Sequence, residues 1–247
     1  MANAERGVPG RFEALCYRFG QPGQLRPLSC ARFVAMTTPY HAAHFTEHPR
    51  RAGVWRAIAA HLAPLVPADA AVLEVGAGYC HWINQVAARR RVALDIWPGV
   101  AEHAAPGVES LVADAGGGLA TIPPASFDVV LASNVLEHFV PDVAAAVVGG
   151  LARVLRVGGR LIVIQPNFRY AYREYFDDYT HRAVFTDVSL PALLRAEGFA
   201  VDRIEPRFLP YSMRATRLPT ASWLVRAYLA SPYRPRAGQM LVVGTRR

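Results

Sequence analysis

The stretch Val72-Leu73-Glu74-Val75-Gly76-Ala77-Gly78-Tyr79-Cys80 decides the fold of this chain. It is a short apolar run that ends in two glycines. Such a run before a glycine-rich turn is typical of a buried parallel strand that delivers backbone N–H groups to a ligand. Gly76 and Gly78 have no Cβ, so a ligand can approach the main chain closely there. The stretch therefore predicts an α/β fold with a ligand site where this strand ends.

A carboxylate follows at the spacing that a ribose needs. The next apolar run, Val92-Ala93-Leu94, ends at Asp95. An acidic residue at the tip of the second strand, about twenty residues after the glycine turn, is where a ribose diol is bound in such folds. The two features together predict a cofactor that contains adenosine.

Other adenosine cofactors and several lysine-dependent sites are disfavoured or excluded. The dinucleotide fingerprint needs a third glycine three residues after the second, and position 81 is His. Glu74 would also be poorly placed beside a diphosphate. All 27 basic residues counted as Lys and Arg are Arg. The absence of lysine excludes a P-loop, the Tyr-Lys pair of short-chain dehydrogenases and a pyridoxal Schiff base.

Five elements resemble, in order and spacing, the motifs of class I S-adenosylmethionine (SAM)-dependent methyltransferases. They are Glu74-Val75-Gly76-Ala77-Gly78, Asp95, Ala113-Asp114-Ala115, the run 127–138 and the run 155–164. The order and spacing of these elements cover roughly residues 70–200. Cys80 departs from the pattern, because many members carry a third glycine there; a small, often buried side chain is compatible with that position.

The resemblance implies a fold, a cofactor and a set of contacts. The fold is a Rossmann-like α/β architecture: a seven-stranded sheet, mostly parallel with an antiparallel last strand, and helices on both faces. SAM would be the cofactor, with Asp95 at the ribose, Asp114 at the adenine and Asn134 near the methionine part. The residues expected to bind SAM are Glu74, Gly76, Ala77, Gly78, Tyr79, Asp95, Ile96, Asp114, Ala115 and Asn134.

The chain divides into three parts. Residues 1–35 have no core-forming pattern, and we expect a disordered extension. Residues 36–68 are expected to form an N-terminal helical cover, and residues 69–247 a single SAM-binding domain with acceptor-pocket insertions at 167–186 and 206–237. We place strands at about 71–75, 91–95, 109–113, 127–132, 160–165, 199–204 and 240–244, and helices at 80–89, 141–156 and 187–197.

The composition limits the possible cellular location and binding partners of the protein. The chain has 247 residues, a 52% hydrophobic fraction and a net charge of +8. No apolar run predicts a membrane span or a signal peptide, although contact with a membrane surface stays open. The 3 cysteines have neither metal-binding nor disulfide-framework spacing, so we expect a reducing, cytoplasmic setting. That the protein is bacterial is an expectation that the family resemblance implies. The positive charge suits nucleic acid, an anionic membrane or a phosphorylated substrate, or reflects only a preference for arginine over lysine.

The segment after the fifth strand carries the candidate catalytic residues. Residues 167–182 are rich in aromatic and charged side chains, and they follow a strand whose carboxyl end borders the ligand edge of the sheet. We expect His181, together with Asp177, to act on the acceptor, because a positioned His can remove a proton from a hydroxyl. The alternative is a structural His181. Asp177, Asp178 and His181 lack a fourth ligand in sequence, so we expect no metal.

Residues 206–237 interleave arginines with aromatic residues. Trp223, Leu224, Ala227 and Tyr228 share helical spacing. One interpretation is a surface helix that covers the sheet; the other is a lid for an anionic or membrane-attached acceptor. In the second case Arg207, Arg214 and Arg217 would contact the acceptor.

The resemblance implies methyl transfer from SAM to a small molecule, as O-methylation. By resemblance to methyltransferases encoded near bacterial polysaccharide genes, the acceptor would be a hydroxyl of a sugar, a glycan precursor or a lipid-linked sugar. A secondary metabolite is the next candidate. An RNA-directed methyltransferase and a non-catalytic SAM-binding partner are the alternatives. Nucleic acid is disfavoured because no RNA-binding module is appended.

Overall fold

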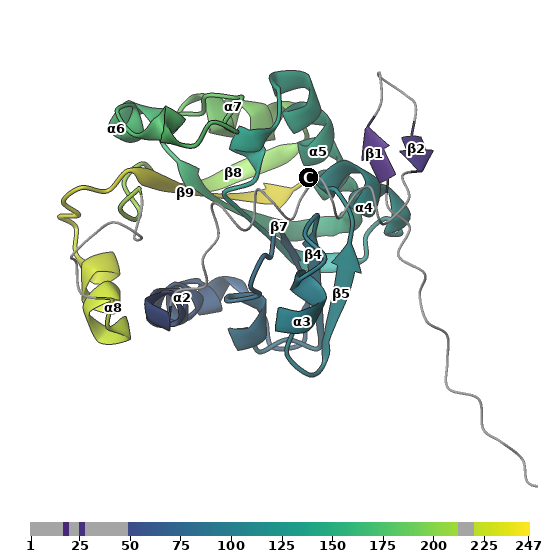
Figure 1. The fold of residues 1–247 in the computed structure, drawn as a ribbon, viewed down its shortest axis with the longest axis horizontal. Helices are drawn as coiled ribbons and strands as arrows, with labels where there is room; N and C mark the ends of the chain where they lie inside the picture. Colours follow the sequence, from purple (N-terminus) through teal and green to yellow (C-terminus); the bar gives the residue numbers. More distant parts are fainter. Residues whose placement is uncertain (1–16, 20–24, 28–48, 212–219) are drawn as a thin grey trace, which may run out of the picture.

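The computed structural model describes residues 17–19, 25–27, 49–211 and 220–247. Its centre is a seven-stranded sheet with the strand order β5-β4-β3-β6-β7-β9-β8 (Figure 1). The strands are β3 (Ala71–Val75), β4 (Arg90–Asp95), β5 (Val108–Val112), β6 (Phe127–Ser133), β7 (Leu155–Pro166), β8 (Phe199–Glu205) and β9 (Gln239–Arg246). Strands β5, β4, β3, β6 and β7 pair in parallel, whereas β9 is antiparallel to both β7 and β8. The Rossmann-like fold class is therefore confirmed.

The sheet brings the ends of its central strands together. Val75, the last residue of β3, is in register with Leu94 of β4 on one side and with Ala132 of β6 on the other. The chain continues from β3 outward to β4 and later returns to the opposite side of β3 as β6. A crevice for ligands forms where the strand order reverses in this way, beyond the carboxyl ends of the strands. The loops that follow β3, β4 and β6 therefore meet at one edge.

Helices cover both faces of the sheet. The α-helices are α2 (Pro49–Leu62), α3 (Val100–His103), α4 (Ala115–Thr121), α5 (Pro141–Val154), α6 (Phe168–Ala171), α7 (Ser189–Ala196) and α8 (Ser222–Ala230). Short 3₁₀ helices are η1 (Ala63–Leu65), η2 (Ile83–Gln85), η3 (Leu136–His138) and η4 (Tyr175–Asp177). Apolar residues of α4, α5 and α7 pack on one face with Leu73 and Val75 of β3. Residues of α2 and α8 pack on the other face with Val72, so β3 is buried on both sides.

The predicted strands are all present within two residues at each end, except that β7 begins earlier, at Leu155. The predicted helix at 80–89 is wrong. Cys80 has a φ of 55°, in the left-handed region, which a right-handed helix does not contain. The segment instead forms turns and η2, and Trp82 and Ile83 are fully buried in this irregular structure. The apolar residues that suggested a helix fill the core as irregular structure.

The remaining segments lie around this core. β1 (Tyr17–Phe19) and β2 (Leu25–Pro27) pair antiparallel, and β1 lies beside α4 (Figure 1). Within the region expected to form a helical cover, α2 is described and residues 36–48 lie outside the described residues. In the described part of the chain, no helix combines the length and hydropathy needed to cross a bilayer.

Helix α8 packs against α2, on the face of the sheet opposite α5 and α7 (Figure 1). Its buried residues are Val225 and Leu229, one turn apart. Of the residues that share helical spacing in the sequence, Trp223 and Ala227 are exposed, whereas Leu224 and Tyr228 are partly buried and Tyr228 packs against the core. This arrangement agrees with a helix that covers the core. Arg214 and Arg217 lie outside the described residues.

Candidate active site

The loop after β3 is tied to β4 through its own amides. Gly76 and Ala77 both donate to the carbonyl oxygen of Leu94, at 2.8 and 3.2 Å. Gly78 donates to Asp95 Oδ2 at 2.7 Å, and Trp97 donates to Asp95 Oδ1 at 2.7 Å. The expectation that this loop delivers its N–H groups to a ligand is therefore wrong for these three amides. Their role here is to hold the loop against the end of β4.

The two glycines serve different purposes. Gly76 has a φ of 72°, and a Cβ at this position would lie 2.3 Å from Val135 Cγ2. Gly78 has a φ of 49°, and a Cβ there would meet no atom within 4 Å. Gly76 is thus required for packing against the chain after β6, whereas Gly78 faces open space.

Two buried carboxylates lie beneath this loop. Glu74 is 3% exposed, and its Oε2 accepts from the Ile83 amide at 3.0 Å. Burial raises the pKa of Glu74 to about 8; the Ile83 amide opposes this rise and the charge of Asp95 adds to it. Burial likewise raises the pKa of Asp95 to about 6, against the effect of the Trp97 and Gly78 amides. A nearby cation would favour the ionised form of both groups.

A cavity of about 410 Å³ lies at the carboxyl edge of the sheet. All ten residues expected to bind SAM line it, from Glu74 in β3 to Asn134 after β6. Asp114 ends the loop after β5 and caps α4 by accepting from the Gly117 amide at 2.8 Å. Asn134 has a φ of 53°, and its amide donates to the Ile164 carbonyl at 2.8 Å, which turns the chain sharply away from β6. The sequence motifs therefore converge on one cavity.

Further residues outside the ten expected to bind SAM also line the cavity. Arg51 and Trp55 come from α2, which precedes the sequence motifs, and they were not predicted. The others are His81 in the loop after β3, Val135, His138 and Phe139 after β6, and Thr180 and Arg182 after β7. His138 had a signal, since it closes the fourth-strand motif, but Asn134 was favoured there. No local pattern distinguishes Thr180 or Arg182.

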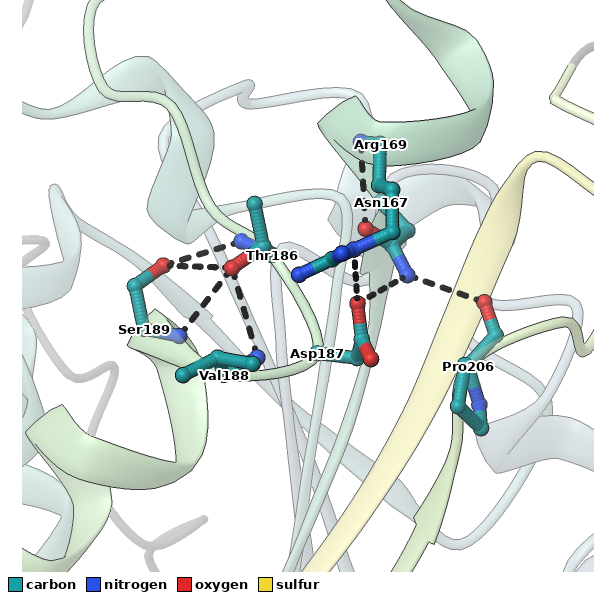
Figure 2. Close-up of polar contacts among 7 residues, drawn as sticks. All are labelled: Asn167, Arg169, Thr186, Asp187, Val188, Ser189 and Pro206. Atoms are coloured by element: carbon teal, nitrogen blue, oxygen red, sulfur yellow. Dashed lines mark hydrogen bonds and ion pairs between the residues drawn. The ribbon is translucent and has the colours of Figure 1, made fainter.

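The segment after β7 is pinned at both ends by one buried side chain (Figure 2). Asn167 is fully buried, and its Nδ2 donates to Asp187 Oδ1 and to the Pro206 carbonyl, both at 3.0 Å. Its Oδ1 accepts from the Arg169 amide at 3.2 Å. Residues 167 and 187 are thereby joined, and the intervening chain is held as a loop over the cavity. Thr186 and Ser189 exchange hydrogen bonds at the start of α7, which fixes the exit of this loop (Figure 2).

Two histidines meet where this loop touches the chain after β6. His138 Nδ1 lies 2.9 Å from Thr180 Oγ1, and Thr180 Oγ1 donates to Asp178 Oδ1 at 2.6 Å. Because the Thr180 hydroxyl gives its one proton to a carboxylate, it accepts from His138 Nδ1–H. His181 Nδ1 lies 2.6 Å from the Tyr175 carbonyl oxygen, which can only accept. In both rings Nε2 is therefore the unprotonated nitrogen.

His181 lies behind His138, with the two ring centroids 5.0 Å apart. Among the described residues, the two predicted to be catalytic, His181 and Asp177, do not line the cavity. Their neighbours do: the cavity is lined here by His138, Thr180 and Arg182. Burial lowers the pKa of His181, against the opposing effects of Asp178 and the Tyr175 carbonyl. The structure thus places the predicted His181 against His138, which lines the cavity, rather than in the cavity wall itself. Asp177 is exposed at the end of η4.

Comparison with known proteins agrees with this geometry. Residues 73–163 match the family model described as "Methyltransferase domain". A SAM-dependent methyltransferase from Archaeoglobus fulgidus superposes with a TM-score of 0.61 at 15% identity, over 85% of this chain and 99% of that chain. A SAM-dependent methyltransferase from Thermotoga maritima gives 0.58 at 21% identity, over 87% of this chain and 97% of that chain. No curated protein matches the chain by sequence.

The matched model spans β3 to β7, which are the strands whose loops form most of the cavity. The same strands supply the glycine turn and the acidic residues that the sequence motifs predicted. The match over residues 73–163 and the shared fold both agree with a methyltransferase domain that uses S-adenosylmethionine as its cofactor.

Proposed function

We propose that the protein transfers the methyl group of SAM to a hydroxyl of a small-molecule acceptor. In this proposal the ten cavity residues from Glu74 to Asn134 bind the cofactor. The acceptor lies beside His138, Thr180 and Arg182. The observation that carries the proposal is the hydrogen-bonded series His138–Thr180–Asp178, which presents an unprotonated ring nitrogen in a residue of the cavity wall.

The chemistry of the cavity suits SAM. Its sulfonium and ammonium groups are cationic, and Glu74, Asp95 and Asp114 place carboxylates on the walls. A carboxylate has about four acceptor positions, so the two amide bonds of Asp95 are compatible with added bonds from ribose hydroxyls. The open space over Gly78 admits a ligand to the main chain. SAM would supply an activated methyl group. The residues of the chain would bind the cofactor, orient the acceptor and remove its proton.

The order of the strands gives the cavity a direction. Asp114 follows β5, Asp95 ends β4, Gly76 follows β3 and Asn134 follows β6. The adenosine end would lie near β5 and the methionine end near β6. Residues after β7 come next along this edge, so the acceptor would meet the methyl group beside Thr180 and Arg182.

His138 would serve as the general base. SAM would supply the methyl group: the acceptor oxygen would gain the O–C bond, and the electrons of the S–C bond would remain on sulfur. The hydroxyl proton passes to His138 Nε2, while Thr180 and Asp178 hold the ring in the required tautomer. His181 would support this role by packing on His138 and staying neutral. In this proposal, Asp177 does not contact the acceptor and contributes only to the conformation of the loop after β7.

A sugar or glycan precursor is the acceptor class we favour. The loop after β7 exposes Tyr170, Tyr172, Phe176 and Tyr179, and aromatic faces combined with a few polar groups are typical of small-molecule sites. Arg182 lines the cavity and adds a positive charge for an anionic group such as a phosphate.

Transfer of a labelled methyl group from SAM tests this function. The acceptors would be sugars, nucleotide sugars, phenols, amines and a short RNA, with mass spectrometry locating the methyl group. Label on an oxygen of a sugar or related metabolite is the expected result. Label on nitrogen or on RNA would contradict the acceptor class. Tight SAM binding with no transfer to any acceptor would favour a non-catalytic partner.

A further inference from the structure

Behind the His138 wall of the cavity lies a group of three side chains with metal-binding atoms. Glu137, His138 and His181 each offer one such atom, and these atoms all lie within 4.8 Å of one another. His138 and His181 belong to different segments, the turn after β6 and the loop after β7. The Arg182 and Ala183 amides both donate to the Glu137 carbonyl, at 2.8 and 3.1 Å, which fastens the two segments together at this point.

Glu137 is the most unusual member of the group. It is fully buried, and among the described residues neither of its carboxylate oxygens has a hydrogen-bond partner. An unpaired buried carboxylate is costly, and buried charges in proteins are paired or coordinate metals. The fold therefore keeps a strong acceptor at a position where the described residues supply no donor.

Both histidines hold one ring nitrogen in a hydrogen bond to an oxygen, as metal-bound histidines do. Each donates its Nδ1–H to an oxygen, His138 to the Thr180 hydroxyl and His181 to the Tyr175 carbonyl. Metal-bound histidines nearly always donate their second ring nitrogen to an oxygen in this way, which fixes the tautomer and ring orientation. Nε2 is left as the nitrogen with the lone pair in both rings. Asp178 accepts from the Thr180 hydroxyl and so extends the hydrogen-bonded support behind His138.

We propose that Glu137, His138 and His181 bind one divalent transition-metal cation at the acceptor end of the cavity. Two imidazole nitrogens and one carboxylate oxygen suit Mn²⁺, Fe²⁺, Co²⁺ or Zn²⁺, and three protein ligands leave coordination positions open. Among the described residues, His138 is the member of the group that lines the cavity, so the cation would be linked to a molecule bound there through His138. This proposal departs from the sequence-based expectation of no metal, which considered Asp177 and Asp178 rather than Glu137.

The cation would act on the acceptor in the function proposed above, and only this part of the inference rests on that function. A hydroxyl oxygen bound to the cation becomes more acidic and is held in place for methyl transfer. The Nε2 lone pairs would then belong to the cation, and the proton would leave to solvent instead of to His138. The acceptor class narrows accordingly to molecules whose hydroxyl can ligate a cation, such as a sugar with neighbouring hydroxyls.

Equilibrium dialysis of the full-length protein tests the site without any acceptor. The probes are Co²⁺, Mn²⁺ and Zn²⁺ at equal concentration, with bound metal counted by mass spectrometry and Co²⁺ also followed by its visible spectrum. We expect about one bound cation per chain. Glu137→Gln and His181→Asn should each weaken binding by at least about tenfold. Asp177→Asn, an exposed carboxylate in the same loop, is the matched control and should bind as the native protein does.

SAM affinity and circular dichroism confirm that each variant is folded. If Glu137→Gln fails to fold, His181→Asn still decides the matter, because its side chain is only half-buried. Failure of the native protein to bind any of the three cations would overturn the site, as would equal binding by the native protein and both variants. Metal binding without methyl transfer would instead count against the proposed function alone, and methyl transfer undiminished by a chelator would restrict His138 to the role of base.

Discussion

The loop after β3 and the loop after β7 border the same cavity, but different interactions hold them. The first is short and is fixed by adjacent strand ends: its amides bond to Leu94 and Asp95, and its glycines permit a backbone that other residues resist. The second spans residues 167–187 and is fixed by Asn167 and Asp187, far apart in sequence. The conformation of the first loop is determined by a local sequence motif, whereas that of the second depends on a contact between residues far apart in the sequence. We infer that the first serves the cofactor and the second the acceptor.

The largest effect should come from the acceptor side. His138→Ala should lower turnover by roughly 10²–10⁴-fold while leaving SAM affinity close to native, because in the proposed function the ring accepts the proton of the acceptor hydroxyl. His181→Ala should also lower turnover, with SAM affinity again retained. The native rate should fall as the pH drops below the ordinary His pKa of 6.5, since protonation removes the lone pairs and burial lowers the pKa of His181. Steady-state kinetics with the identified acceptor measure this, and near-native turnover of both variants would reduce the pair to a structural role.

Stability should respond most to the first glycine of the cofactor loop. Gly76→Ala places a Cβ 2.3 Å from Val135 Cγ2 in a left-handed conformation, so it should cost roughly 2–5 kcal/mol of unfolding free energy. Gly78→Ala has the left-handed strain without the clash and should cost about 1–2 kcal/mol. Urea denaturation compares the two. Equal destabilisation would show that Val135 can move aside and that Gly76 has no special packing role.

The buried carboxylate of the cofactor loop predicts a pH dependence. The pKa of Glu74 is raised from 4.5 to about 8, so between these values the folded chain keeps a proton that the unfolded chain has lost. The free energy of unfolding should therefore fall as pH rises across this window, by an amount on the order of a few kcal/mol. Glu74→Gln should flatten the fall in thermal melts without SAM. Glu109→Gln is the control, since the pKa of that exposed, Arg90-paired carboxylate is lowered; an unchanged profile in Glu74→Gln would refute the assignment.

A smaller effect should separate the two regions directly. Asn167→Ala removes three hydrogen bonds at the base of the acceptor loop, including the one to the Pro206 carbonyl, and should cost about 1–3 kcal/mol of stability. The loop would then lose its position, so KM for the acceptor should rise while SAM affinity stays native. Thr186→Ala, at the far side of the same anchor, serves as a milder comparison. A matching loss of SAM affinity in Asn167→Ala would show that the two regions are not separable.

The difference between the regions also explains what could be predicted from sequence. The strands were located because buried parallel strands are short apolar runs, and the cavity residues after β3, β4, β5 and β6 followed from the motifs at their ends. Segment 80–89 was mistaken for a helix, because the left-handed Cys80 and the burial of Trp82 are consequences of tertiary packing. His181 was identified, but His138 and Glu137 gain their significance only when the loop after β7 folds back onto them.

The most direct test of this account compares SAM affinity across the two regions by titration calorimetry. Asp95→Ala removes the carboxylate that fixes the Gly78 and Trp97 amides and faces the cavity, and we predict that it weakens SAM binding by about 10- to 100-fold. His138→Ala and the exposed control Asp177→Ala should bind SAM as the native protein does. Undiminished affinity in Asp95→Ala, or a loss confined to His138→Ala, would contradict the assignment of the cofactor to the loop after β3.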